Sequence, residues 1–264
     1  MDTIKEHDRD IVATITAQLE TIAAKEQITI LYACESGSRA WGFPSPDSDY
    51  DVRFIYLRPL ECYLSIDDRP DTLDLPIDSL LDINGWDLRK ALKLFKSSNS
   101  AIYEWIQSPI VYKSHSNLTA ELLNLAHSYY AARAGIHHYL NMTTNCDREY
   151  LQADTVKLKK YFYAIRPILA AKWIVKHRTF PPMVLDKLLP LISDRSDILA
   201  EIDRLLTIKV NANEATTIPA SPILNDFIRS EIDNCEAAVK LIPKHETNTF
   251  ALDRLFKKYA IDNS

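Results

Sequence analysis

Glycine, paired cysteines and long apolar runs are all scarce in this 264-residue chain. No apolar run approaches the roughly 20 residues that a membrane span needs, so we expect no membrane segment. The four cysteines are scattered without a CxxC pair, which argues against a zinc knuckle or a disulfide scaffold. The first residues are too charged for a secretory signal, and a cytoplasmic, reducing location is therefore expected.

The composition is that of a folded protein, and acidic and basic residues are concentrated in different parts of the sequence. The chain has a mass of 30.2 kDa and 47% apolar residues, enough for two compact domains with a real core. Its net charge of −5 argues against a general nucleic-acid coat protein. Residues 41–90 hold eleven acidic and five basic residues, whereas 131–180 hold nine basic and three acidic ones. This division suits a site for divalent cations and a polyphosphate, although two ordinary solvated surfaces would explain it equally well.

The first 115 residues alternate between helical and strand patterns. Apolar periodicity predicts a helix over 8–25, strands over 27–34, 51–57 and 78–84, and helices over 86–97 and 101–107. Gly85 is expected to end the third strand. The segment 35–48 is predicted to be a loop, which holds two of the four glycines.

From residue 116 onward the patterns are helical only. Helices are expected over 117–140, 150–176, 181–193, 195–209, 221–242 and 250–259, and Pro167 should kink or break the second of them. The segment 214–222 has the composition of a linker. The prediction is an α+β fold, with an N-terminal domain (1–115) built on a small mixed sheet with flanking helices and an all-helical domain (116–264).

The most informative stretch is 36–54, SGSRAWGFPSPDSDYDVRF. Asp49 and Asp51 alternate at the start of a strand, so both carboxylates should point to one spot, where a hard cation such as Mg²⁺ would relieve their repulsion. A calcium loop starting at Asp47 is excluded, because its sixth and twelfth positions hold Val52 and Arg58. A P-loop is excluded because Phe43-Pro44 replaces its Lys-Ser/Thr. Aspartates that only cap turns stay possible, but aspartate is disfavoured inside a strand.

Gly37-Ser38 followed by Asp49-Tyr50-Asp51-Val52 resembles the signature of the DNA polymerase β superfamily of nucleotidyltransferases. The longer blocks SGSRAWGFPSPDSDYDVRFIY, LDINGWDLRKAL, SNSAIYEWIQSPIVY and KLKKYFYAIRPILAAKWI are similar to one branch of it, the YcgL-type nucleotidyltransferases, which are linked with RNA-repair pathways. The resemblance covers roughly residues 20 to 190.

This resemblance implies a third carboxylate on a later strand. Asp82, between Leu81 and Ile83, fits that setting better than Asp87, whose position at a helix start is explained by the helix dipole. Asp49, Asp51 and Asp82 would then be the catalytic residues and the ligands of two Mg²⁺ ions, with Mn²⁺ as a substitute.

The same resemblance implies where the triphosphate binds. Gly37 and Ser38 would present backbone N–H groups and a hydroxyl to the β- and γ-phosphates, and Arg39 would neutralise their charge. An ordinary exposed arginine explains Arg39 equally well.

The helical half supplies the expected counter-charge. Lys159, Tyr163 and Arg166 lie at i, i+4 and i+7, on one helix face, where they could hold phosphates and stack a base. A solvated basic face is the alternative, and Lys160, about 100° round the helix, is a second choice for the cleft. Glu104, amid apolar neighbours, must be paired if it is buried, which indicates a structural support.

The function expected from these residues is Mg²⁺-dependent transfer of a nucleoside monophosphate from a nucleoside triphosphate to an acceptor hydroxyl, with release of pyrophosphate. RNA, as an RNA end or a tRNA, is the favoured acceptor. The alternatives are nucleotidylation of a protein, a metal-dependent glycosyltransferase, and a nucleotide- or RNA-binding module without turnover. The sequence favours no base and sets no oligomeric state.

Overall fold

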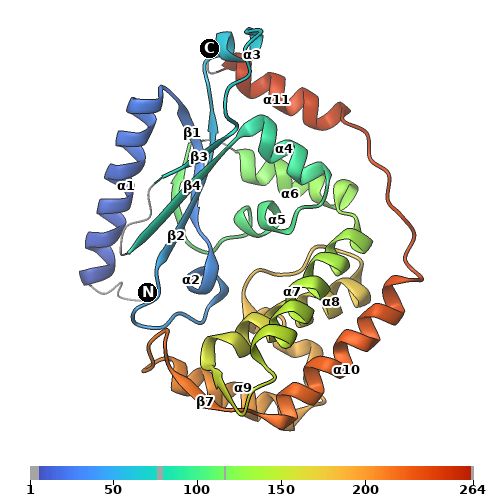
Figure 1. Ribbon diagram of the computed structural model, residues 1–264. Coiled ribbons are helices and arrows are strands. Elements are labelled where there is room, and N and C mark those ends of the chain that lie inside the picture. The colour runs from blue at the N-terminus through green and yellow to red at the C-terminus, as the bar shows by residue number, and fades with distance from the viewer. Residues whose placement is uncertain (1–5, 76–79, 116, 263–264) are drawn as a thin grey trace.

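A computed structural model describes residues 6–75, 80–115 and 117–262 (Figure 1). Its N-terminal half is built on a five-stranded sheet with the order β3-β4-β2-β1-β5. The strands are β1 (Thr29–Glu35), β2 (Tyr50–Leu57), β3 (Thr72–Asp74), β4 (Leu81–Asp87) and β5 (Val111–Ser114). β2 and β4 are parallel and the other neighbours antiparallel, which confirms the mixed sheet.

Helices cover both faces of this sheet. α1 (Glu6–Glu26) places Ile15 and Leu19 against one face, where they pack with Val52 and Phe54 of β2. The other face packs on helices near the sheet, among them α4 (Leu88–Lys96), α5 (Ser100–Trp105) and α6 (Leu118–Tyr129). Because side chains alternate along β2, Asp51 and Arg53 lie on this second face, opposite α1.

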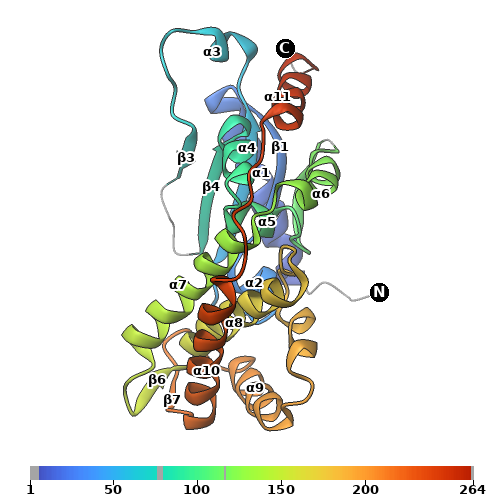
Figure 2. The ribbon, with the colours of Figure 1, turned by 90° about the vertical axis from the view of Figure 1, so that its right-hand side faces the viewer.

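The rest of the chain is mostly helical. Its long helices are α7 (Ala132–Tyr150), α8 (Leu158–His177), α9 (Ser196–Lys209), α10 (Pro222–Val239) and α11 (Phe250–Asp262). This part also contains the 3₁₀ helices η1 (Leu185–Lys187) and η2 (Leu189–Ile192) and a pair of strands, β6 (Thr155–Lys157) and β7 (Thr217–Pro219). Two short helices of the N-terminal half, α2 (Gly37–Trp41) and α3 (Leu60–Leu64), follow β1 and β2 along the chain. After α10 the chain returns to the sheet side, where α11 lies beside α4 (Figures 1 and 2).

Several predicted boundaries were wrong. The segment 117–140 forms parts of two helices, because the chain leaves the helical conformation at Tyr130 and Ala131. The expected linker at 214–222 includes β7, which pairs with β6, and 181–193 contains only short 3₁₀ turns. The loop predicted at 35–48 contains α2.

Glycine and proline also acted differently from expectation. Gly85 lies inside β4 rather than after it, because an added Cβ there would come within 2.2 Å of the Phe54 ring on β2. α8 continues through Pro167, since the middle of this helix is buried against its neighbours and their packing compensates for the missing hydrogen bond. Both residues serve close packing rather than chain termination.

One apolar core joins the sheet to the helical half. The Phe43 ring stacks on Phe162 of α8 with ring centroids 5.0 Å apart, and both belong to a cluster that includes Ile55 of β2. The boundary near residue 115 therefore remains a prediction. Within the described residues, no helix combines the length and the apolar character that crossing a bilayer requires.

Candidate functional site

Asp51 and Asp82 lie side by side on the two parallel strands of the sheet. In the register of β2 and β4, Asp51 is the direct partner of Asp82. Arg53, two residues along β2 on the same face, places Nη2 3.0 Å from Oδ1 of Asp51 and 2.6 Å from Oδ2 of Asp82. One guanidinium group therefore contacts both carboxylates and offsets part of their mutual repulsion.

Asp49 is the most exposed of the three predicted carboxylates and directly precedes β2. Burial raises the pKa of Asp51, the Arg53 charge lowers it, and the charges of Asp82 and Asp49 raise it further. The three side chains thus form one electrostatic group. The described ranges contain no cluster of three or more His, Cys, Asp or Glu side chains already arranged around a metal position.

Gly37 makes room for Asp51. It starts α2 with a φ of +59°, and an added Cβ would lie only 1.9 Å from Oδ2 of Asp51. The backbone N–H of Ser36 donates to the Asp51 carbonyl at 2.8 Å, which ties the two segments together. Ser38, the next residue of α2, is buried. The expected Gly-Ser turn is therefore the first turn of a short helix pressed against the carboxylate.

Glu35, at the end of β1, is a residue of the site that sequence reasoning missed. It is fully buried, and its Oε1 accepts a hydrogen bond from the Asp51 backbone N–H at 2.8 Å, while the Tyr112 hydroxyl donates to Oε2. Burial raises its pKa to about 7, and the nearby Asp51 charge adds to the shift. Its position directly after a buried strand and just before Gly37 was the available signal.

Arg39 holds the loop that carries Asp49. Its Nε donates to the Asp49 carbonyl at 3.1 Å and its Nη2 to the Ser48 carbonyl at 2.7 Å. The guanidinium carbon lies 3.6 Å from the centroid of the Tyr50 ring, a cation–π contact. Arg39, which is predicted to contact a triphosphate, thus holds the backbone directly before β2 in place.

A cavity of about 470 Å³ separates these strands from α7 and α8, and it has the size of a ligand site. Gly37, Asp51 and Arg53 line one side. Lys160 and Tyr163 of α8 line the other. The sheet and the helical half therefore both contribute walls to a single cavity.

Lys159 and Lys160 point to different partners. Lys159, the first choice for the cleft, pairs with Glu214, its Nζ 2.9 Å from Oε2, and is not among the cavity's lining residues. Lys160 places Nζ 3.4 Å from the ring centroid of Tyr150, which also lines the cavity. Burial raises the pKa of the Tyr163 hydroxyl to about 12, and negative charges, first that of Glu214, add to the rise.

Arg166 lies at the cavity wall inside a buried network. It is only 1% exposed, and its Nη2 lies 2.9 Å from Oε1 of Glu104. Glu104 also accepts hydrogen bonds from the Trp41 indole at 3.0 Å and the Tyr139 hydroxyl at 2.7 Å. Nε of Arg166 donates to the Met183 carbonyl. The charge predicted for phosphate binding is thus balanced within the protein.

The two remaining aspartates have structural positions. Asp87 caps α4, accepting from the Arg89 backbone N–H and from the Tyr63 hydroxyl, both at 2.7 Å. It lies five residues beyond Asp82, roughly 16 Å along β4. The Asp47 carboxylate accepts from the Glu214 backbone N–H at 3.0 and 3.1 Å.

A mixed sheet with two in-register aspartates beside a Gly-Ser segment is the arrangement that the polymerase β resemblance implied. Residues 11–258 match the model of the family described as "RlaP: RNA repair pathway DNA polymerase beta family". The chain is also 43% identical over 242 residues to the uncharacterized protein YcgL of Bacillus subtilis (strain 168), covering 91% of this chain and 93% of that protein. This chain therefore belongs to the RlaP family.

Proposed function

We propose that this protein is a divalent-cation-dependent nucleotidyltransferase, which transfers a nucleoside monophosphate from a nucleoside triphosphate to an acceptor hydroxyl. The observation that best supports this is the convergence of Asp51 and Asp82 on Arg53, beside the Gly37 backbone at the wall of a ligand-sized cavity. Membership of a polymerase β family supports the same type of chemistry.

The donor set fits Mg²⁺, which prefers oxygen ligands and is usually bound by one or two carboxylates together with substrate phosphates. Asp49 and Asp51 would hold two ions, Asp82 would complete the position nearest the acceptor, and Mn²⁺ would serve as a substitute. When bound, such ions neutralise charge on the triphosphate and on the attacking oxygen. The missing Cβ of Gly37 lets Oδ2 of Asp51 lie against the backbone where phosphates would bind.

The chain's own groups then align the reaction. Arg53 offsets the repulsion between Asp51 and Asp82 in the free protein, so that both carboxylates stay in place. Asp82 accepts the proton of the acceptor hydroxyl as its oxygen forms a bond to the α-phosphorus. The bond from the α-phosphorus to the oxygen bridging to the β-phosphate breaks, and pyrophosphate leaves. Positioning and charge neutralisation are the main requirements of such a transfer.

The nucleotide would bind across the cavity. Gly37 and Ser38 would contact the β- and γ-phosphates through backbone N–H groups and the hydroxyl. Lys160 and Arg39 would add positive charge, and Tyr163 would stack on the base. In this arrangement Arg166 acts indirectly, since it holds Glu104 and Trp41, whose indole also lines the cavity. Lys159 supports the Glu214 loop.

RNA is the proposed acceptor, as an RNA end or a tRNA. The support is the RNA-repair description of the family together with the basic residues of 131–180. Lys160 of that segment lines the cavity, and Arg148 donates a hydrogen bond to Asn145, which also lines it. A protein side chain is the alternative acceptor that the experiment below distinguishes.

The test is incubation with each α-labelled nucleoside triphosphate and Mg²⁺, with and without cellular RNA. We expect label to enter RNA and this transfer to disappear in Asp51→Asn, while Asp47→Asn, which alters an exposed carboxylate bonded to Glu214, keeps it. Label on protein instead of RNA would indicate that the acceptor is a protein side chain. If nucleotide binds but neither transfer nor pyrophosphate release is detected, the proposal is overturned and a binding module is favoured.

A further inference from the structure

The carboxylate of Glu35 replaces a backbone acceptor beside Asp51, at the point where β1 ends. β1 and β2 are antiparallel with Glu35 opposite Val52, so Ser36 and Asp51 form the next opposed pair. The two residues of a hydrogen-bonded antiparallel pair normally exchange two backbone hydrogen bonds. Here the Ser36 N–H donates to the Asp51 carbonyl at 2.8 Å, whereas the Asp51 N–H donates to Oε1 of Glu35, also at 2.8 Å.

The reason for this replacement is that the chain leaves the sheet directly after Ser36. Gly37 begins α2 with a φ of +59°, a conformation that does not continue a strand. The Asp51 N–H still needs an acceptor, and the Glu35 side chain supplies it. The same bend brings Gly37 against Oδ2 of Asp51. Two consecutive turns of the chain thus hold the backbone and the side chain of Asp51.

Glu35 is itself fixed from the other side by β5 and the residues before it. Its backbone N–H donates to the Ile110 carbonyl at 2.9 Å, and its carbonyl accepts from the Ser108 hydroxyl at 2.6 Å. The hydroxyl of Tyr112, on β5, donates to Oε2. The side chain is fully buried and is not among the residues that line the cavity of about 470 Å³. Any influence of Glu35 on that cavity therefore passes through Asp51.

A buried carboxylate is costly unless hydrogen bonds satisfy it, and both oxygens of Glu35 are used by neighbouring strands. We propose that Glu35 is a positioning residue for the nucleotidyl transfer, which fixes the Asp51 backbone so that the Asp51 carboxylate stays beside Asp82. This inference rests on the proposed function, in which Asp51 is a metal ligand.

The first test compares Glu35→Leu with Glu35→Gln. Glutamine keeps an oxygen for the Asp51 N–H, and its NH₂ group can donate to the Tyr112 oxygen, whereas leucine offers no acceptor. Because a small displacement of a catalytic group is costly, Glu35→Leu should lower kcat at least about tenfold. KM for the nucleoside triphosphate should change little, since Glu35 does not line the cavity. Glu35→Gln should recover most of kcat.

The second test measures metal binding without turnover. Electron paramagnetic resonance gives the affinity for Mn²⁺ in the presence of a nucleoside triphosphate analogue with a methylene group between the α- and β-phosphates. Groups that orient a metal ligand affect affinity strongly, so Glu35→Leu should bind Mn²⁺ about tenfold more weakly than the parent. Glu35→Gln should bind it nearly as well. A role in stability alone would lower the melting temperature and leave the Mn²⁺ affinity of the folded protein unchanged.

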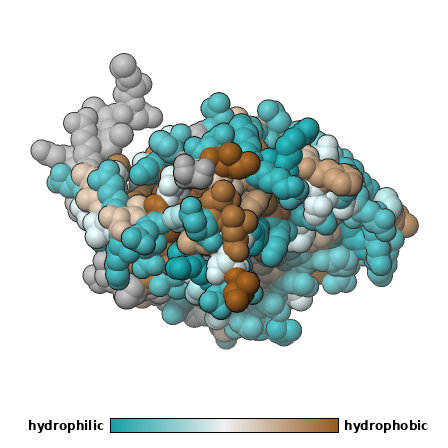
Figure 3. Space-filling view, turned by 90° about the horizontal axis from the view of Figure 1, so that it is seen from above, coloured by the Kyte–Doolittle hydropathy of each residue, from teal (hydrophilic) through white to brown (hydrophobic). Residues whose placement is uncertain are grey.

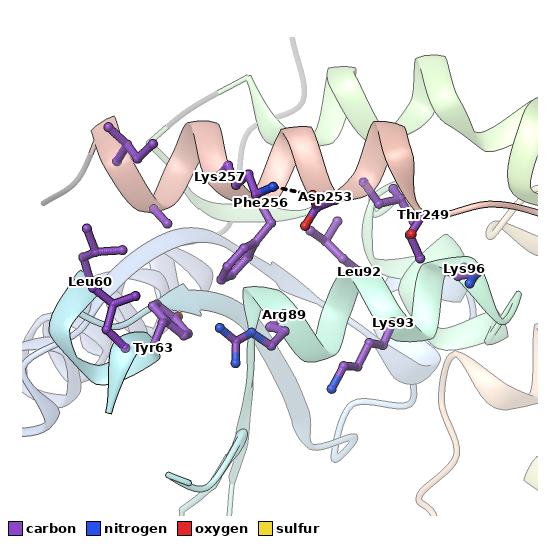
Figure 4. A pocket seen from close by; sticks show the side chains of 14 residues that line it. Leu60, Tyr63, Arg89, Leu92, Lys93, Lys96, Thr249, Asp253, Phe256 and Lys257 are labelled. Atoms are coloured by element: carbon purple, nitrogen blue, oxygen red, sulfur yellow. Dashed lines mark ion pairs between the residues drawn. The ribbon is translucent and has the colours of Figure 1, made fainter. Parts of the chain in front are cut away.

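Tyr112→Phe and Tyr63→Phe form a matched pair, because each removes a hydroxyl that donates to a buried carboxylate. The Tyr63 hydroxyl donates to Asp87 at 2.7 Å, and Tyr63 lines a cavity of about 680 Å³ between α3, α4 and α11 (Figure 4). Figure 3 looks onto this end of the molecule, away from α7–α10. Tyr112→Phe should lower kcat about threefold, and Tyr63→Phe should leave it unchanged. Equal kcat values in the two variants would overturn the proposal even if Glu35→Leu did not fold.

The outcomes separate this proposal from the proposed function. A parent protein without nucleotidyl transfer would overturn the proposed function, and the Mn²⁺ affinities would still decide the role of Glu35. A parent that transfers, with Glu35→Leu equal to it in kcat and Mn²⁺ affinity, would overturn the positioning role alone. Glu35→Gln no better than Glu35→Leu would do the same. A parent that binds no Mn²⁺ would contradict both proposals.

Discussion

The two walls of the candidate site use charge in opposite ways. On the strand wall, Asp51 and Arg53 line the cavity, and Asp82, the neighbour of Asp51 on β4, shares the Arg53 cation with Asp51. On the helical wall, the Arg166 charge is buried and balanced by Glu104 inside the protein. The comparison indicates that the strand wall is built to receive added positive charge, whereas much of the helical wall's charge maintains the fold.

The largest expected effect tests the helical wall. Arg166→Met leaves the Glu104 carboxylate buried without its cation, and removing one partner of a buried pair costs about 3–5 kcal/mol. Denaturant unfolding should show this loss. Arg204→Met, which removes an exposed pair with Glu201, should leave the midpoint little changed.

Arg166→Met with Glu104→Leu should recover much of the stability, since no unpaired charge then remains buried. If Arg166→Met were as stable as the parent but lost nucleotide binding, the charge of Arg166 would belong to the ligand and the contrast between the two walls would fail.

The next effect tests the strand wall. Gly37→Ala places a methyl group on Oδ2 of Asp51 and forces alanine into a positive φ, so we expect a loss of transfer activity of about 100-fold or more. Gly42→Ala provides the control, because Gly42 also has a positive φ but an added Cβ meets only Val184 at 3.3 Å. It should lose stability and keep its activity per folded molecule. Equal activities of the two variants would remove the special role of Gly37.

A smaller effect separates the neighbouring lysines of α8. Lys160→Ala should raise the KM for the nucleoside triphosphate about tenfold. A hydrogen bond to a charged group is worth roughly 1.5–3 kcal/mol, and the lower end of this range is expected at a partly solvated site. Lys159→Ala, which loses its pair with Glu214, should change KM less. Steady-state kinetics measures the KM of both variants. A larger rise in Lys159→Ala than in Lys160→Ala would indicate that Lys159, rather than Lys160, contacts the nucleotide.

The smallest effect concerns thiol reactivity. Burial raises the pKa of Cys34 and Cys235 to about 12 and that of Cys146 to about 11, so these thiols stay protonated at pH 8. Cys62 is the cysteine that is not buried. Mass spectrometry after brief alkylation of the native protein at pH 8 should find one labelled site, Cys62. Raising the pH toward 11 should first add Cys146, and rapid labelling of Cys34 at pH 8 would contradict its burial.

The strand wall could be predicted from the sequence and much of the helical wall could not. Alternation along an extended chain fixes which residues share a face, and the setting of Asp82 between apolar residues marked it as part of a strand. A helical pattern also gives relative directions, but it does not say which direction faces the cleft. Lys159 and Lys160 are distinguished only by where Glu214 and Tyr150 lie, which depends on tertiary packing.

Burial explains the remaining differences. Arg166 lies in the buried middle of α8, so its guanidinium needs a partner within the protein, and Glu104 supplies it from α5. Glu35 was missed because a charged residue after a strand usually faces solvent, whereas here Tyr112 and the Asp51 backbone satisfy its carboxylate. The Arg166–Glu104 pair and the Tyr112–Glu35 hydrogen bond each join segments that are far apart along the chain.

We propose that Asp82, rather than Asp87, completes the site with Asp51. The most direct test is the initial rate of pyrophosphate release from a nucleoside triphosphate with acceptor RNA and Mg²⁺, for Asp82→Asn and Asp87→Asn, at a temperature where both are folded. We expect a loss of about 100-fold or more for Asp82→Asn and a nearly unchanged rate for Asp87→Asn. A full rate in Asp82→Asn, with the loss in Asp87→Asn, would contradict it.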